Sequence, residues 1–102
     1  MKSEHWNDMN GNPAGGTTYG VGFTIGWQHG PLGRGENRKE PNGAFVEDII
    51  KAAIDRIEFY QQSKFASEFN AETLRLLAAA LAVQITRTVT REARGVEGLN
   101  VE

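Results

Sequence analysis

Glycine and proline are concentrated in the first part of this sequence, and their distribution limits where long helices can form. Ten of the twelve glycines and all three prolines lie in residues 1–43. Both residue types weaken a helix interior, so long helices are expected only after residue 43. A chain of 102 residues is expected to form one small domain. The sequence therefore predicts an α+β fold in which a glycine-rich segment precedes the helices.

The part of the chain before residue 44 is expected to hold a flexible terminus and a glycine-rich segment with at most a short β-hairpin. Residues 1–18 are polar and glycine-rich, and we expect them to be flexible. In "TYGVGFTIGWQ", residues 18–28, large side chains alternate with small or polar ones, as in a half-buried strand. The alternating residues are Tyr19, Val21, Phe23, Ile25 and Trp27. "HGPLGRGENRKEPNG" then predicts a turn and loop with room for a return strand, so residues 19–43 should form a short β-hairpin or an irregular segment.

Residues 44–102 are predicted to form a helical-hairpin domain. The first helix lies within "PNGAFVEDIIKAAIDRIEFYQQS", where apolar residues follow the 3.6-residue period and Asn42 or Gly43 could provide the N-cap. The second, "AETLRLLAAALAVQITRTVTREAR", is expected to begin after an Asn70 cap and to stop at Gly95, which can adopt the left-handed conformation. Because the connection between them is short, the two helices should pack antiparallel.

The second helix has more apolar surface than one partner helix can cover. One apolar stripe consists of Leu74, Leu77, Leu81 and Ile85. A second stripe, about 140–180° away around the helix, consists of Leu76, Ala80 and Val83. A helix that is apolar nearly all round is buried all round. In so small a domain we expect the second stripe to meet another subunit, so the protein is predicted to be a homo-oligomer.

Three arginines share one side of the end of this helix, in "RTVTREARG": Arg87, Arg91 and Arg94. Basic residues suit a helix C-terminus, and Glu92 or Glu97 could form ordinary ion pairs with them. Arg87, however, lies two turns inside the helix, where the dipole effect has faded. A guanidinium also presents a planar fork of donors suited to phosphate. Helix-end charge, ion pairing and an anionic ligand all remain open, and Arg94 is best explained as terminal charge.

Aromatic and polar residues near the connection between the helices form a second candidate cluster: Tyr60, Phe65, Phe69 and Asn70. Core packing is the usual role of such aromatic residues, but an exposed ring can stack on a purine, and an asparagine amide can read a polar group of a ligand. Arg34 and Arg38 make the preceding loop locally basic. A basic loop is usually just solvated, although higher assembly could create a second ligand site there.

The composition argues against several classes of function. The formal net charge of −2 is unlike that of a DNA or RNA binder, and the absence of cysteine excludes thiolate metal sites. His5 and His29 are isolated, and no nucleophile–base pair follows from the spacing, so no catalytic residue, metal or cofactor is expected. "LLAAALAV" is too short to span a bilayer, and "MKSEHWNDMN" lacks a signal-peptide core. We expect a cytoplasmic protein without a membrane partner.

The second half of the sequence resembles a known family. The resemblance rests on an "IDRIEFYQ"-type first helix, an "F-A-x-x-x-N" connection and an "R-T-x-x-R-E-x-R-G-V-E-G" ending, all within residues 42–98. These motifs are similar to those of the helical-hairpin domain in phage anti-defence sponges, the Thoeris anti-defence and anti-CBASS proteins. Such proteins sequester nucleotide second messengers in the infected bacterial host.

The resemblance implies a ligand and a set of ligand-binding residues. The ligand would be a cyclic ADP-ribose isomer or a cyclic di- or trinucleotide, bound without turnover. Tyr60 stands where the family has a base-stacking aromatic residue, and Asn70 matches an asparagine that contacts the ligand. Arg87 and Arg91 match two arginines that take the phosphates. Family members form dimers with pockets at the subunit boundary, and often hexamers.

The leading hypothesis is therefore a nucleotide sponge with Tyr60, Asn70, Arg87 and Arg91 as ligand-binding residues. Further candidates for ligand contacts are Phe65, Arg94, Arg34 and Arg38. One alternative is a structural or host-protein-binding helical hairpin that uses its second apolar stripe on a partner. The least supported alternative is a small nucleotide phosphodiesterase, because the sequence offers it no general base or metal cluster.

Overall fold

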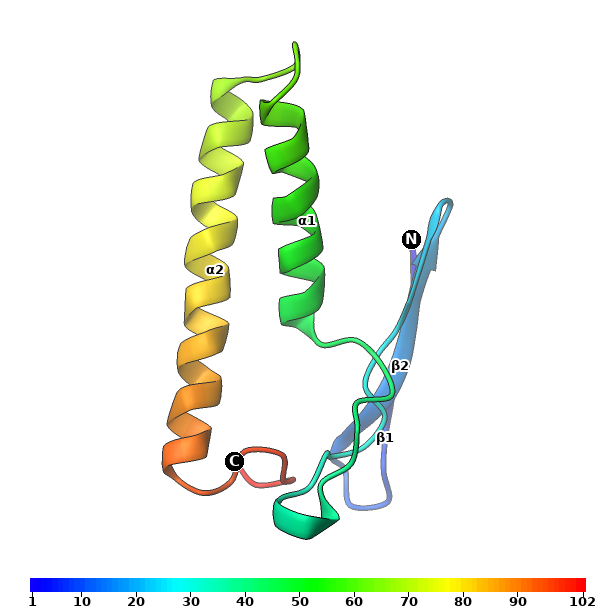
Figure 1. The fold of residues 1–102 in the computed structure, drawn as a ribbon. Coiled ribbons are helices and arrows are strands. Elements are labelled where there is room, and N and C mark those ends of the chain that lie inside the picture. The colour runs from blue at the N-terminus through cyan, green and yellow to red at the C-terminus, as the bar shows by residue number, and fades with distance from the viewer. The chain divides into compact units, whose positions relative to one another are not determined.

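A computed structural model describes all 102 residues and confirms the α+β class (Figure 1). The elements in chain order are β1 (Lys2–Asn7), β2 (Pro13–Gly20), β3 (Phe23–Gly26), the short 3₁₀ helix η1 (Gly35–Asn37), α1 (Val46–Gln61) and α2 (Glu68–Ala93). They belong to two compact units. The sheet unit comprises residues 1–45 and 91–102, and the helical unit comprises residues 46–90.

The polar beginning of the chain, which we expected to be flexible, forms β1 and the first part of β2. The three strands make one antiparallel sheet in the order β1-β2-β3. Glycine permits this sheet because β1 comes very close to β2. The Trp6 indole lies against Gly15, and a Cβ at Gly16 would clash with the backbone carbonyl of Glu4. The glycines thus serve close strand packing here, a role that composition alone does not distinguish from flexibility.

The expectation of one strand over residues 18–28 is wrong, because a tight turn divides this stretch. Gly20 pairs with Phe23 across a two-residue turn, and Gly22 adopts a φ of 87° that favours glycine. Val21 is fully exposed at the turn. The hairpin therefore joins β2 to β3, and the expected loop after residue 28 is confirmed, with η1 as its only helical turn.

A buried threonine organises the small core of the sheet unit. Thr18 accepts a hydrogen bond of 2.8 Å from the Trp27 indole N–H, and its hydroxyl lies 3.1 Å from that of Ser3. The only other side chains buried to this degree are those of Ala14 and Leu32. With so few buried apolar groups, the unit depends strongly on its backbone and side-chain hydrogen bonds.

Asn42 and Gly43 do not cap α1, which begins at Val46. The Asn42 side chain instead makes two hydrogen bonds with the backbone of His29, one accepted and one donated. Gly43 passes so close to the Trp27 carbonyl that a Cβ would clash with it. Ala44 then bridges to Trp27 in parallel pairing. Residues 42–44 therefore extend the sheet unit, and the helix can begin only after them.

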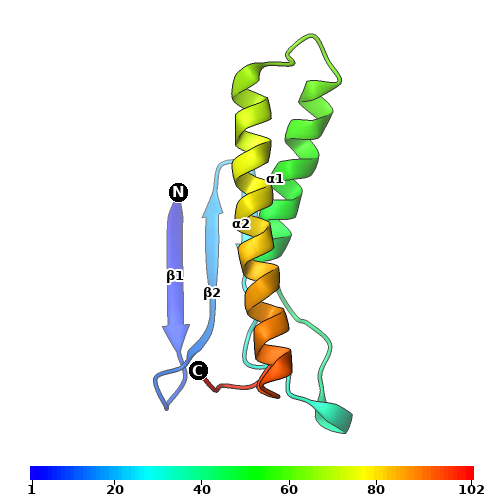
Figure 2. The same cartoon turned by 90° about the vertical axis from the view of Figure 1, so that its left-hand side faces the viewer.

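Within the helical unit, α1 and α2 lie side by side and antiparallel, as predicted (Figure 1 and Figure 2). The half-buried residues of α1, apart from Glu47 near its start, are Ile50, Ala53, Ile54, Ile57 and Gln61. Those of α2, apart from Asn70 near its start, are Leu74, Leu77, Leu81, Gln84, Thr88 and Arg91. No side chain of either helix is fully buried. Neither helix is sufficiently long and apolar to cross a membrane.

The apolar stripes of α2 largely follow the expectation. The first contains Leu74, Leu77 and Leu81, but Gln84 and not Ile85 continues it, since Ile85 remains 48% exposed. The second stripe is uncovered in the single chain: Leu76 is 53% exposed and Val83 is 66% exposed. This apolar surface is available to a partner.

One end of α2 is capped as expected, and the other end is not. Ser67, not Asn70, is the N-cap, because its hydroxyl accepts a hydrogen bond from the Asn70 backbone N–H. The helix therefore starts three residues earlier than expected, and Asn70 lies within its first turn. At the other end Gly95, with a φ of 74°, stops the helix as predicted. Its N–H bonds to the Glu92 carbonyl and that of Val96 to the Arg91 carbonyl, a Schellman motif.

Gly16→Ala should destabilise the sheet unit by about 1–3 kcal/mol, because the new methyl group would push β1 away from β2. Gly26→Ala is the matched control, since a Cβ there has no neighbour within 4 Å. The measurement is chemical denaturation followed by tryptophan fluorescence. Equal midpoints for the two variants would contradict the proposed close packing at Gly16.

Candidate functional site

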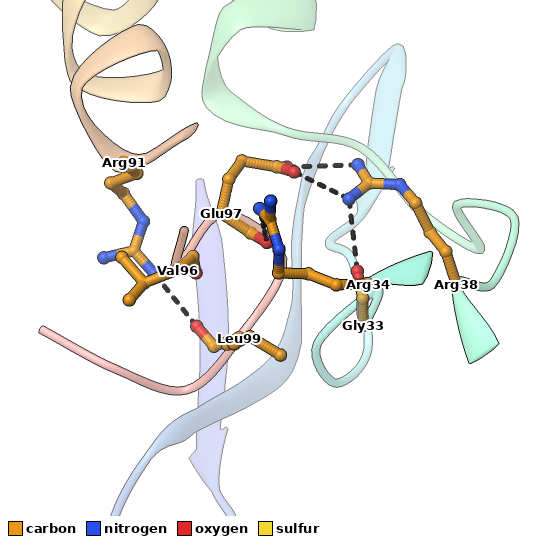
Figure 3. A network of polar contacts seen from close by, with 7 residues as sticks. All are labelled: Gly33, Arg34, Arg38, Arg91, Val96, Glu97 and Leu99. Carbon is orange, nitrogen blue, oxygen red and sulfur yellow. Dashed lines mark hydrogen bonds and ion pairs between the residues drawn. The ribbon is translucent and has the colours of Figure 1, made fainter. Parts of the chain in front are cut away.

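Arg91 is held by the C-terminal segment, residues 94–102, that follows its own helix (Figure 3). Its guanidinium donates hydrogen bonds to the carbonyl oxygens of Val101 at 2.7 Å, Val96 at 3.1 Å and Leu99 at 2.9 Å. A guanidinium has five N–H groups, so two remain available. The residue predicted to bind a phosphate is therefore also the residue that shapes the C-terminal segment.

Glu97 connects this segment to the loop around η1. Its carboxylate forms a two-point ion pair with Arg38, at 2.6 and 3.1 Å, and its backbone carbonyl accepts a hydrogen bond of 3.0 Å from Arg34. Arg38 also donates to the carbonyl of Gly33 at 3.1 Å. The backbone N–H of Gly33 in turn donates to the Gly98 carbonyl at 2.7 Å. The C-terminal segment is thus fastened to the loop by both side chains and backbone.

The cations around Glu97 alter its acidity. The hydrogen bond from Arg38, together with the charges of Arg38, Arg34 and Arg91, lowers the pKa of the Glu97 carboxyl against the opposing effect of burial. The same ion pair raises the pKa of Arg38. Three arginines thus surround one carboxylate, which leaves local positive charge that an anion could use.

The structure therefore brings together arginines that the sequence treated as two separate groups. Arg34 and Arg38 come from the loop around η1, and Arg91 comes from α2, yet all three bind the C-terminal segment (Figure 3). The expected pairing of Glu97 with an arginine of "RTVTREARG" does not occur as a direct bond, because Arg38 occupies both carboxylate oxygens.

Arg87 differs from Arg91 in having no partner. Its side chain is exposed and makes no hydrogen bond or ion pair within the chain. It lies one turn before Arg91 on α2. Arg94, at the end of the helix, is exposed as well and also has no partner within the chain. Arg87 therefore keeps all of its N–H donors available, at a position well before the end of the helix.

The other predicted residues gather at the connection between the helices. Tyr60 is 37% exposed, and Phe65 is 67% exposed with the Lys64 ammonium 5.3 Å from its ring centre. Asn70 donates a hydrogen bond of 3.3 Å from its amide to the Phe65 carbonyl, and no bond engages its amide oxygen. The Gln61 side chain closes the connection by bonding to both the N–H and the carbonyl of Ser67. The connection is thus an ordered loop with exposed rings.

The two groups of predicted residues lie at opposite ends of α2. Asn70 and Arg87 are separated by about 25 Å along the helix axis, at 1.5 Å per residue. A single cyclic nucleotide could not reach both. The structure therefore does not bring Tyr60 and Asn70 together with Arg87 within one chain.

Sequence reasoning missed several residues that organise these regions: Arg56, Gln61 and Ser67 near the connection, and Glu97 as the partner of Arg38. Arg56 could have been found, because it precedes Phe59 by three positions and Tyr60 by four, spacings that place side chains together on a helix. The Arg38–Glu97 pair left no local signal, since 59 positions separate its partners.

Comparison with known proteins identifies the family. No protein-family model matches the chain. A stretch of 75 residues, 74% of the chain, is 37% identical to Thoeris anti-defense 1 from Bacillus phage SBSphiJ7. The chain belongs to a phage anti-defence family. The resemblance seen in the helical motifs is confirmed at this level. The matched region spans half the length of this anti-defence relative.

The contribution of Glu97 to stability should depend on pH. Because its pKa is lowered in the folded protein, the ion pair stabilises the fold above the unfolded-state pKa of about 4.3. That stabilisation is lost as the pH falls through the lower folded-state pKa. We expect Glu97→Gln to lower the thermal unfolding midpoint of the sheet unit at pH 7 and to flatten its dependence on pH below 5, as measured by tryptophan fluorescence.

Glu72→Gln is the control for this prediction. Glu72 also has a lowered pKa, caused by its hydrogen bond to Arg75, but both side chains are more than half exposed and lie within one helix. Such a surface pair contributes little. A Glu97 variant that behaved like the Glu72 variant would show that the C-terminal segment does not depend on its ion pair.

Proposed function

We propose that this protein is a phage anti-defence sponge, which binds a cyclic nucleotide second messenger and holds it without cleavage. The messenger would be a cyclic ADP-ribose isomer or a cyclic di- or trinucleotide. Its depletion in the cytoplasm of the infected bacterium would block Thoeris or CBASS signalling. The observation that carries this proposal is the likeness to Thoeris anti-defense 1.

The separation of the candidate residues supports a site shared between two copies of the chain. In an antiparallel pair of α2 helices, Tyr60 and Asn70 of one copy would meet Arg87 and Arg91 of the other. The second apolar stripe offers the surface for such a pair, because Leu76 and Val83 are more than half exposed. Burying them would stabilise the pair by the hydrophobic effect. The proposed assembly is a homodimer, with hexamers as higher assemblies.

Each residue would have a distinct task in this shared pocket. Arg87, with all its donors available, would form charge-assisted hydrogen bonds to a phosphate. Arg91 would add its two remaining N–H groups. The Tyr60 ring would stack on the base, and the amide oxygen of Asn70 would accept a hydrogen bond from base or ribose. Binding of this kind needs affinity and abundance but no chemical step, so we propose that the protein is not an enzyme.

Heat release of the ligand tests the proposal. The protein is incubated with cyclic ADP-ribose isomers and cyclic di- and trinucleotides, separated from free nucleotide, and then denatured by heat. We expect intact nucleotide to be recovered, as identified by mass spectrometry. Cleaved nucleotide would instead support the phosphodiesterase alternative. Failure to bind any nucleotide would favour the host-protein-binding hairpin.

Complementation between variants tests the shared pocket. Arg87→Ala and Tyr60→Leu should each weaken binding, the former by at least about 30-fold, equivalent to about 2 kcal/mol. In an antiparallel pair of one Arg87→Ala chain and one Tyr60→Leu chain, one pocket carries both changes and the other carries neither. We therefore expect the mixed dimer, isolated with two affinity tags, to bind tightly at one of its two pockets.

Arg94→Ala serves as the control, because Arg94 is also exposed and unpaired but is explained by its position at the helix end. Binding should survive this change. If the mixed dimer bound no better than the single variants, each pocket would have to lie within one chain. Size-exclusion chromatography of every variant checks that the oligomer persists.

A further inference from the structure

Arg56 lies over two aromatic rings at the end of α1. Its guanidinium carbon is 4.8 Å from the ring centre of Tyr60 and 5.0 Å from that of Phe59. The two rings are themselves 6.1 Å apart and inclined by 60°. Both separations between the cation and the rings are within the range of cation–π attraction, about 6 Å. The three side chains form an aromatic–arginine cluster on one side of the helix.

No carboxylate competes for Arg56. The residue is exposed, and it makes no hydrogen bond or ion pair within the chain. Its rings are accessible too, with Phe59 58% exposed and Tyr60 37% exposed. Because Arg56 is exposed to water and pairs with no carboxylate, its position over the two rings is explained by its attraction to them. It consequently restricts the orientation of Tyr60.

This restriction bears on how a base would bind. A tyrosine ring has two faces, and the guanidinium lies over one of them. A base can then stack only on the opposite face, and a ring already fixed in position loses less conformational entropy when it binds. Purines, which have the larger aromatic surface, gain most from such a platform.

We propose that Arg56 is a positioning residue for nucleotide binding, which orients the Tyr60 ring as a stacking platform for a purine base. This inference rests on the proposed function, because it assumes that Tyr60 contacts the ligand. Arg56 acts through Tyr60 and need not touch the nucleotide itself.

A double-mutant cycle with a cyclic ADP-ribose isomer, which contains adenine, tests the proposal. Calorimetry on the intact chain would compare wild type, Arg56→Met, Tyr60→Leu and the double variant. We expect Arg56→Met to weaken binding roughly 3- to 30-fold, the range of cation–π energies. In the Tyr60→Leu background the same change should have an effect below about twofold, because the ring through which Arg56 acts is gone.

Two further variants separate positioning from folding and from general charge. Arg56→Lys retains a cation and should restore part of the affinity lost in Arg56→Met. Lys51→Met removes a positive charge from the same helix, on another side, and should leave binding unchanged. Helical content and oligomeric state are measured for each variant.

The outcomes distinguish this inference from the function on which it rests. If the wild-type protein binds no nucleotide, the proposed function fails and this inference fails with it. If the wild type binds but Arg56→Met binds equally well, only the inference fails. A loss that persists in the Tyr60→Leu background would also overturn it, since Arg56 would then contact the ligand directly or stabilise the fold.

Discussion

The central constraint on this molecule is that two helices alone cannot cover the apolar surface of α2. No side chain of α1 or α2 is fully buried, and Leu76 and Val83 are more than half exposed. The sheet unit has its own small core around Thr18. The two helices by themselves therefore leave apolar side chains of α2 in water, and the proposed pairing with a second copy would bury them. The same pairing would complete the proposed nucleotide pocket.

The helices could be predicted because their determinants are local. The 3.6-residue period can be read from the residues of each helix, and Gly95, which stops α2, lies just after its last turn. The sheet could not be predicted in this way. The close packing that requires Gly15 and Gly16 depends on Trp6 and Glu4 in the neighbouring strand. Similarly, Ser67 and Asn70 are both good capping residues, and only the fold of the connection decides between them. Local sequence predicts the helices, whereas nonlocal contacts decide whether a glycine allows close strand packing and whether an asparagine caps a helix.

The candidate site shows the same division. Tyr60 and Asn70 near the connection, and Arg87 on α2, could be proposed as ligand-binding candidates from the helical motifs. The engagement of Arg91 by three carbonyl groups was not, because it depends on how the chain turns after Gly95. Substitution of Arg91 would therefore disturb the C-terminal segment as well as any phosphate contact. Arg87, which has no internal partner, gives the cleaner test of ligand binding.

Both tryptophans of the chain, Trp6 and Trp27, belong to the sheet unit. The long helices lie almost entirely in the other unit, which contains no indole. Indole emission therefore reports on the folding of the sheet unit, where loss of the Trp27 hydrogen bond to Thr18 would change it. Far-ultraviolet ellipticity reports mainly on the helices. The chain thus carries a separate optical probe for each unit, and comparing the two signals during denaturation would show whether the units unfold together or in sequence.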